Sequence, residues 1–217
     1  MKPSISSIPI GRAKLEALLE VPDGAKGVVL FAHGSGSSRL SPRNAYVARV
    51  VREAGIGTLL FDLLTEDEAS DRSNVFDIEF LAARLQAATD WIRHIGSAQG
   101  LGIGYFGAST GAAAALVAAA GDETIGAIVS RGGSPDLAGA ALPRVKAPTL
   151  LIVGGEDTEI IELNEEAYER LTCTKELKIV PGATHLFEEP GTLEEVARLA
   201  RDWFKLHLRS SVTERRR

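Results

Sequence analysis

The chain has 217 residues, of which 45% are apolar and 24% are charged, and its formal net charge is −5 at pH 7. This size and composition are typical of a single soluble globular domain and argue against a disordered or fibrous protein. Basic residues do not cluster on any predicted face apart from the terminal ERRR, so we do not expect nucleic acid as a partner.

The cysteine content and the ends of the chain indicate the compartment. The single cysteine, Cys173, excludes an intramolecular disulfide and a cysteine-based metal cluster. The first residues lack the apolar core of a signal peptide, and the longest apolar runs are too short to cross a bilayer. We therefore predict a cytoplasmic protein without a membrane partner, with one domain over residues 1–208 and a flexible tail over 209–217. The sequence leaves the oligomeric state open, a homodimer included.

Short β-rich runs alternate with amphipathic segments along the chain. The predicted strands cover residues 5–10, 13–21, 27–34, 57–64, 101–106, 124–130, 147–155 and 174–182. The predicted helices begin at Pro42 and cover, further along the chain, residues 77–95, 109–120, 159–171 and 192–207. This alternation predicts an α/β fold with a mostly parallel sheet covered by helices on both faces. The first two strands, separated by Gly11 and Arg12, are expected to form an antiparallel pair at one edge.

Local signals predict where some of these elements begin. Ser41 before Pro42 is a predicted N-cap, and Thr192 with Glu195 three residues later is typical of a capping box. Residues 65–76 are acidic and show no periodicity, so we expect a loop there, and it is the one candidate for a lid.

The sequence GASTG, residues 107–111, lies where a predicted strand turns directly into a predicted helix. In that position the pattern G-x-S-x-G is typical of a nucleophile elbow, in which Ser109 projects from the sheet edge on a tight, strained turn. Serine is also a common helix N-cap, so the five residues alone do not decide between the two roles.

A nucleophilic serine needs an imidazole base, and that base needs a carboxylate to orient it. Asp157 follows the strand TLLIVGG, and His185 lies in the loop after the next strand. Both, like Ser109, come just beyond the carboxyl end of a predicted strand, where open α/β sheets place their binding crevices. We therefore predict a catalytic triad of Ser109, Asp157 and His185.

Other residues of the same types are weaker candidates. His33 ends a central strand, but it leads straight into a glycine loop, and we expect it to shape that loop through hydrogen bonds. His94 and His207 lie near helix C-termini, where histidine commonly interacts with the helix dipole. For the carboxylate, Glu156 is adjacent to Asp157, and Asp136 after the preceding strand is the reserve candidate.

The sequence HGSGSS, residues 33–38, follows the third predicted strand. Acyl transfer needs two N–H donors for the developing oxyanion, commonly from such a loop and from the residue after the nucleophile. We assign these backbone donors to Ser35 and Thr110. A flexible turn or a phosphate-binding loop are the alternatives, although no lysine follows in the pattern of a nucleotide-binding loop.

On the segments FAHGSGSS, GASTG, LLIVGGED and PGATHLF, the chain resembles the α/β-hydrolase superfamily, and within it the small proteins similar to dienelactone hydrolases. The resemblance covers nearly the whole chain. It implies an α/β-hydrolase fold with a mostly parallel sheet of about eight strands, a minimal cap or none, and a triad of Ser109, Asp157 and His185.

One difference from that family concerns the substrate. Dienelactone hydrolases proper use a cysteine nucleophile, whereas the elbow here holds Ser109 and Cys173 lies far from it in sequence. Three arginines near predicted strand or loop ends, Arg39, Arg43 and Arg131, are candidates for holding a substrate carboxylate.

The prediction from these residues is a serine hydrolase that cleaves a small-molecule carboxylic ester or lactone through an acyl-enzyme, with no metal and no cofactor. A hydrolase-like protein that binds a small ligand without catalysis is the first alternative. An NADP-dependent oxidoreductase is the second, because Gly102, Gly104 and Gly107 formally match G-x-G-x-x-G. Gly102 and Gly104 fall inside the predicted strand, however, where a dinucleotide fingerprint would not place them.

Overall fold

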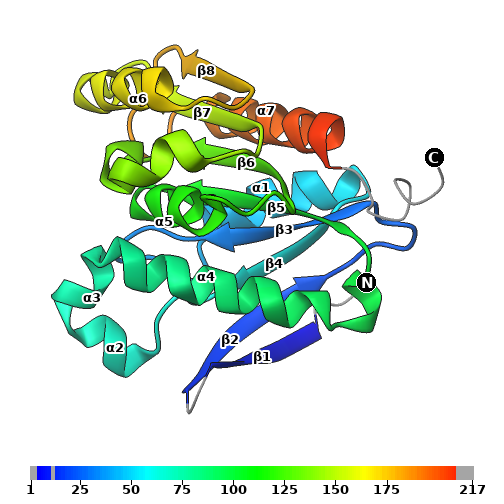
Figure 1. Cartoon of the computed structure of the whole chain (residues 1–217). Coiled ribbons are helices and arrows are strands. Elements are labelled where there is room, and N and C mark those ends of the chain that lie inside the picture. The colour runs from blue at the N-terminus through cyan, green and yellow to red at the C-terminus, as the bar shows by residue number, and fades with distance from the viewer. Residues whose placement is uncertain (1–3, 11–12, 209–217) are drawn as a thin grey trace.

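The computed structural model describes residues 4–10 and 13–208, and its centre is a twisted sheet of eight strands (Figure 1). The spatial order is β1-β2-β4-β3-β5-β6-β7-β8. The strands are β1 (Ser4–Ile10), β2 (Ala13–Glu20), β3 (Gly27–Ala32), β4 (Gly57–Phe61), β5 (Gly102–Ala108), β6 (Ile125–Arg131), β7 (Thr149–Gly154) and β8 (Lys175–Val180). The predicted fold class and strand number are confirmed.

Two antiparallel contacts join one edge of the sheet to its parallel part. β1 pairs with β2, and β2 pairs with β4, in antiparallel register, while the contacts from β4 through β8 are all parallel. The expected antiparallel edge pair is therefore confirmed, although its turn at residues 11–12 lies outside the described residues. In the parallel part, all carboxyl ends of the strands reach the same edge.

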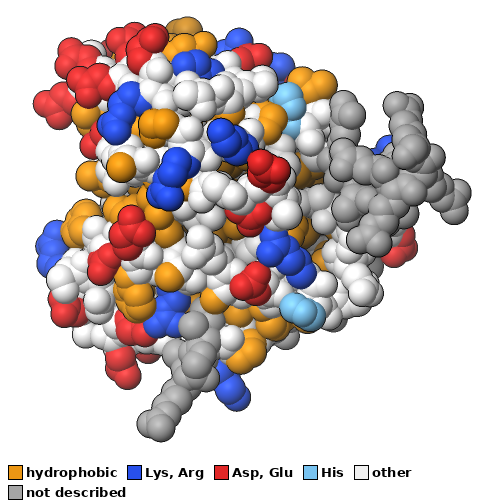
Figure 2. Space-filling view, viewed as in Figure 1, with side chains coloured by type: hydrophobic (Ala, Val, Ile, Leu, Met, Phe, Trp, Pro, Cys, Tyr) orange, Lys and Arg blue, Asp and Glu red, His pale blue; other side chains and the backbone are white. Residues whose placement is uncertain are grey.

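Helices cover both faces of the sheet (Figure 1). One face packs against α4 (Ile78–Arg93), α5 (Thr110–Ala119) and α6 (Thr158–Arg170), and the other against α1 (Pro42–Glu53) and α7 (Thr192–His207). The central strands β3, β4 and β7 are buried along their whole length, which agrees with their mostly apolar sequences. The acidic side chains at the upper left of Figure 2 lie over α6, whose sequence holds five glutamates.

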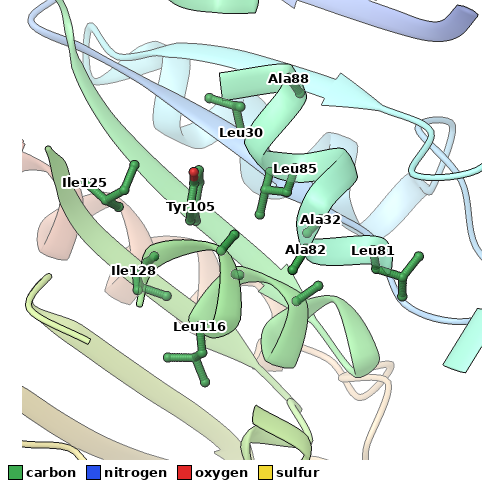
Figure 3. Packing of buried hydrophobic residues seen from close by; sticks show 14 of the residues in the cluster. Leu30, Ala32, Leu81, Ala82, Leu85, Ala88, Tyr105, Leu116, Ile125 and Ile128 are labelled. Carbon is green, nitrogen blue, oxygen red and sulfur yellow. The ribbon is translucent and has the colours of Figure 1, made fainter. Parts of the chain in front are cut away.

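Alternate residues of the central strand β5 face opposite layers. Tyr105 packs with Leu85 and Leu116 on the side of α4 and α5 (Figure 3). Phe106 packs on the opposite side against Phe31, with ring centroids 4.9 Å apart. The small side chains of the alanine-rich α5 are fully buried, so this helix lies close against the strand that precedes it.

Residues 65–76 correct one prediction, because they form two short helices rather than a loop. These are α2 (Glu66–Ser70) and α3 (Arg72–Phe76). Thr65 and Glu68 form a reciprocal capping box at the start of α2, and the Asp71 carboxylate accepts from the Ser73 N–H at the start of α3. Local capping, rather than an apolar stripe, defines these helices, since neither contains a buried residue. Periodicity could not detect them.

The start of α7 corrects another prediction. The helix begins at Thr192 as expected, but its N-cap is Gly191, with φ 86°, and no side chain caps it. The Thr192 hydroxyl instead donates to the Glu189 carbonyl, and the Glu195 carboxylate accepts from Arg198. The predicted capping box is therefore absent, because Thr192 lies inside the helix rather than before it. The Ser41 cap is confirmed, since its hydroxyl accepts from the Asn44 N–H.

Two connections contain 3-10 helix, at Gly96–Ala98 and at Pro135–Arg144, and the second is interrupted by a kink at Gly139. The second occupies the connection from β6 to β7. Within residues 4–10 and 13–208, no helix is both long and apolar enough to span a membrane. The predicted tail, 209–217, lies outside the described residues.

Candidate active site

The three predicted triad residues meet at the carboxyl edge of the sheet. Ser109 directly follows β5, Asp157 follows β7 and precedes α6, and His185 lies in the loop between β8 and α7. The strands β5, β7 and β8 run parallel, so their carboxyl ends lie at the same edge of the sheet. Segments that are distant in sequence therefore come together there.

Ser109 has a strained backbone conformation, with φ 52° and ψ −125°. A residue with a side chain seldom adopts a positive φ, and such a conformation costs about 1–3 kcal/mol that the surrounding structure must offset. The tight turn depends on two glycines. A Cβ on Gly107 would lie 2.4 Å from the Ala112 Cα, and one on Gly111 would lie 2.2 Å from the Ala32 carbonyl oxygen. The turn therefore has the geometry of a nucleophile elbow rather than of an ordinary N-cap, and the Ser109 side chain makes no capping hydrogen bond.

The segment after β6 connects Ser109 to the histidine loop. The Ser109 N–H donates to the Arg131 carbonyl at 3.3 Å, and the Ser134 N–H donates to the Ser109 carbonyl at 3.3 Å. On the other side, a Cβ on Gly132 would lie 3.6 Å from the His185 Cε1. Ser109 and His185 thus pack against the same four-residue segment, 131–134.

Asn164 of α6, which the sequence analysis did not single out, holds this segment in place. It is fully buried, and its Nδ2 donates to the Gly133 carbonyl at 3.0 Å and to the Ile160 carbonyl at 2.8 Å. The sequence did contain a signal for this role, because Asn164 is an uncharged polar residue on the buried stripe of a helix. A buried amide requires hydrogen-bond partners.

His185 and Asp157 form a direct pair. The Nδ1–H of His185 donates to Asp157 Oδ2 at 2.7 Å, a distance typical of a charge-assisted hydrogen bond. This bond fixes the tautomer that leaves Nε2 free to accept a proton. Among the described residues, the Ser109 hydroxyl makes no hydrogen bond to His185. Catalytic hydrogen bonds are often long before substrate binds.

The loop that carries His185 is itself fixed at two points. Phe187 is buried and has φ 56°, the second positive φ at a described residue other than glycine. The N–H and the hydroxyl of Thr184 both donate to the Glu189 carboxylate, and these bonds lower the pKa of Glu189 below its ordinary value.

His33, the weaker candidate for the base, uses both ring nitrogens in structural hydrogen bonds. Its Nε2 accepts from the Leu63 N–H at 3.1 Å, so its Nδ1–H donates to the Gly34 carbonyl at 3.0 Å. Burial lowers its pKa from the ordinary value of 6.5. His33 is therefore neutral. It bonds to the glycine loop, as the sequence analysis expected, and also to the loop after β4.

The buried, neutral His33 predicts that acidification lowers the stability of the fold. Because the pKa of His33 is lower in the folded protein, the unfolded chain binds more protons below about pH 6.5, and acidification destabilises the fold. Urea unfolding at pH 7.5 and 5.5 should show a larger loss of unfolding free energy for the wild type than for His33→Gln. An equal loss in both proteins would contradict the neutral assignment.

The two residues assigned to the oxyanion hole contact one another. The Ser35 N–H donates to the Thr110 Oγ1 at 3.1 Å. Thr110 is the first residue of α5, where backbone N–H groups lack partners within the helix and the dipole favours negative charge. The contact between the Ser35 backbone and the Thr110 hydroxyl was not foreseen, since G-x-S-x-G leaves the identity of that residue open.

The three predicted substrate arginines fall into two groups. Arg39 forms ion pairs with Asp62 and Glu16, so its charge is already compensated. Arg43 and Arg131 lie close enough for the charge of Arg43 to lower the pKa of Arg131. Asp136, the reserve carboxylate, is not bonded to His185, and its Oδ1 is buried without a partner among the described residues.

A cavity of about 1020 Å³ lies beside the glycine- and serine-rich loop at residues 33–38. It extends from residues 33–40 across the loop after β4 to α3, and it shares Gly34 and Ser35 with the elbow region. Its apolar lining comes from Leu40, Leu63, Leu64, Val75, Phe76 and Leu81. The arrangement therefore combines a turn that has the geometry of a nucleophile elbow with an adjacent, partly apolar cavity.

Comparison with known proteins identifies the family. The model of the "Dienelactone hydrolase family" matches residues 15–208, which is most of the chain. The chain belongs to the dienelactone hydrolase family. The resemblance read from the four sequence segments is thereby confirmed.

Solved structures agree with this family assignment. A dienelactone hydrolase from Anabaena variabilis ATCC 29413 is 57% identical, has a TM-score of 0.93, and the match covers 96% of this chain and 99% of that one. Est1E from Butyrivibrio proteoclasticus is 17% identical with a TM-score of 0.78, over 93% and 97% of the two chains, so it supports the fold alone.

A relative in Mycobacterium tuberculosis (strain ATCC 25618 / H37Rv) has a different name. It is 60% identical over 191 residues and is named as a phosphoribosyl transferase. The match covers 88% of this chain but 43% of the relative. This member of the dienelactone hydrolase family thus spans less than half the length of that curated relative.

Proposed function

We propose that the chain is a serine hydrolase that cleaves a small-molecule carboxylic ester or lactone through an acyl-enzyme intermediate. One observation carries the proposal: the strained backbone of Ser109, at the turn from β5 to α5, lies at the same sheet edge as the hydrogen-bonded pair of His185 and Asp157. Membership of the dienelactone hydrolase family supports hydrolysis as the reaction class.

Each residue of the site has a separate role in the proposed reaction. The Ser109 hydroxyl attacks the acyl carbon while His185 Nε2 accepts its proton, and His185 then returns that proton to the leaving alcohol. Asp157 holds the imidazole orientation and stabilises the imidazolium through the 2.7 Å bond. The N–H groups of Thr110 and Ser35 hold the oxyanion, which requires the Ser35 N–H to release or share its bond to the Thr110 hydroxyl. Water then attacks the acyl-enzyme by the reverse sequence of proton transfers.

The transferase name of the longer relatives does not change this assignment. The matched segment makes up 43% of their length, so most of their sequence lies outside the region shared with this chain. Within this chain, the loop HGSGSS lacks the lysine of a nucleotide phosphate loop, and the residues of the elbow suit acyl transfer. We therefore assign hydrolysis to the shared segment.

The cavity suggests an acyl group with apolar character. We expect p-nitrophenyl esters of medium acyl length to be hydrolysed with a higher kcat/KM than the acetate, since part of the cavity lining is apolar. Phe76, which is 51% exposed, contributes to that lining. Phe76→Ala should lower kcat/KM for the longer esters several-fold and leave acetate hydrolysis unchanged.

A matched control is Leu206→Ala, because Leu206 is similarly exposed but lies at the opposite end of the sheet. It should not alter the chain-length profile. Failure to hydrolyse any ester or lactone, together with retained binding of a substrate analogue, would contradict the proposal and favour a noncatalytic binding protein.

A further inference from the structure

Arg131 is a buried cation, and two of its guanidinium nitrogens have no acceptor in the described part of the chain. It is the last residue of β6, it is 8% exposed, and its Nε and Nη1 are buried with no hydrogen-bond partner among the described residues. A buried charge without a partner is costly, and buried cations in proteins are normally paired. The position of Arg131 therefore requires an explanation beyond packing.

A second arginine increases this cost. Arg43 lies in the first turn of α1, and its Nε is likewise buried without a partner in the described part of the chain. Burial, together with the nearby charge of Arg43, lowers the pKa of Arg131 to about 10. Two nearby cations oppose folding unless an anion compensates their charge.

The neighbouring acidic groups compensate this charge only in part. Glu188 accepts from Arg43 Nη1 at 3.2 Å, but its side chain is 64% exposed. Asp157, at the same edge, is bonded to His185. The first turn of α1 holds no acidic residue, so the positive end of the helix dipole adds to the two guanidinium groups.

Other contacts of Arg131 do not satisfy its N–H groups. The Phe187 ring centroid is 6.0 Å from its Cζ, at the limit of a cation–π contact. By contrast, Arg39 and Arg84 bond directly to carboxylates, Arg39 to Asp62 and Arg84 to Glu68. Arg39 and Arg84 are thus paired, whereas Nε and Nη1 of Arg131 have no partner among residues 4–10 and 13–208.

We propose that Arg131 and Arg43 form a binding site for a phosphate group. Three buried guanidinium nitrogens need acceptors there, and a phosphate provides several strong acceptor oxygens with nearly two negative charges. The N-terminus of α1 adds the dipole that favours such an anion. Glu188 is exposed enough to move aside when the phosphate binds.

The site lies next to the elbow. Arg131 pairs with Ala108 in the register of β5 and β6, and its carbonyl accepts from the Ser109 N–H. The bound group therefore has two possible sources. It is part of a phosphorylated substrate or product, or it is free phosphate that binds as an effector. Phosphate binding to Arg131 and Arg43 does not require ester hydrolysis and can be measured without catalysis.

Thermal unfolding and calorimetry with inorganic phosphate test this proposal. Phosphate should raise the Tm of the wild-type protein more than sodium chloride of equal ionic strength, and sodium acetate should raise it less than phosphate does. Arg131→Met and Arg43→Gln should each weaken phosphate binding about tenfold or more, since each removes charge-assisted hydrogen bonds. Arg49→Gln is the matched control on α1, because Arg49 is exposed and pairs with Glu53.

A second readout separates binding from a structural role. In phosphate-free buffer, Arg131→Met should unfold at a higher Tm than the wild type, because it removes an uncompensated buried charge. A structural role predicts a lower Tm instead. Equal phosphate binding by the wild type and Arg43→Gln, or no phosphate effect beyond that of chloride, would overturn the proposal.

Ester kinetics distinguish the two sources of the phosphate. Competitive inhibition of p-nitrophenyl ester hydrolysis by phosphate would indicate a subsite for a phosphorylated substrate or product. Binding without competition would indicate a separate effector site. A protein without esterase activity that still binds phosphate would contradict the proposed function and leave this site intact.

Discussion

Ser109→Ala is expected to lower kcat for ester hydrolysis by about four to six orders of magnitude, the loss that removal of a serine nucleophile causes in triad enzymes. Alanine lacks the hydroxyl that would form the acyl-enzyme, while the oxyanion donors and the binding cavity remain. Initial rates with the best p-nitrophenyl ester measure the change. The Tm should stay close to that of the wild type, because serine and alanine have a similar free-energy cost of adopting the backbone conformation at φ 52°.

The matched control is Ser97→Ala, since Ser97 is exposed and lies in the 3-10 helix at Gly96–Ala98, which precedes β5. It should retain full activity. A Ser109→Ala protein that keeps more than about a tenth of the wild-type kcat would exclude Ser109 as the nucleophile.

Gly111→Ala is expected to destabilise the fold by about 3 kcal/mol or more, at the upper end of the cost of overpacking. The new Cβ would lie 2.2 Å from the Ala32 carbonyl and 2.6 Å from the His33 carbonyl. Both contacts are with backbone, which cannot rotate away, so β3 and α5 must separate. Urea unfolding measures the loss, and activity should fall with it because the elbow moves.

Gly96→Ala provides the control, because a Cβ at Gly96 meets no atom within 4 Å. Its effect should stay within about 1 kcal/mol. If Gly111→Ala were as stable as Gly96→Ala, the close approach of the elbow to β3 would be wrong.

Strong local patterns explain why much of the fold was predictable. The central strands are continuously apolar, since both faces of the sheet are covered, and such runs are distinct from the amphipathic helices between them. The elbow was predictable for the same reason, because GASTG occupies a strand-to-helix turn whose backbone requires small neighbours.

Features that depend on non-local contacts were not predictable. The short helices α2 and α3 depend on capping bonds, which a search for periodicity overlooks. The bond from the Ser35 backbone to the Thr110 hydroxyl depends on how β3 and β5 lie side by side. Likewise, the sequence suggested three substrate arginines without indicating that Arg39 is paired, whereas two nitrogens of Arg131 have no partner among the described residues.

Mass spectrometry after treatment with a fluorophosphonate probe tests the central claim most directly. An activated serine reacts covalently with such a probe, whereas a serine that only begins a helix does not. We expect one adduct in the wild-type protein, on the peptide that contains Ser109, and loss of labelling in the His185→Ala variant. An unlabelled Ser109 in a protein that still hydrolyses esters, or an adduct on another serine, would contradict it.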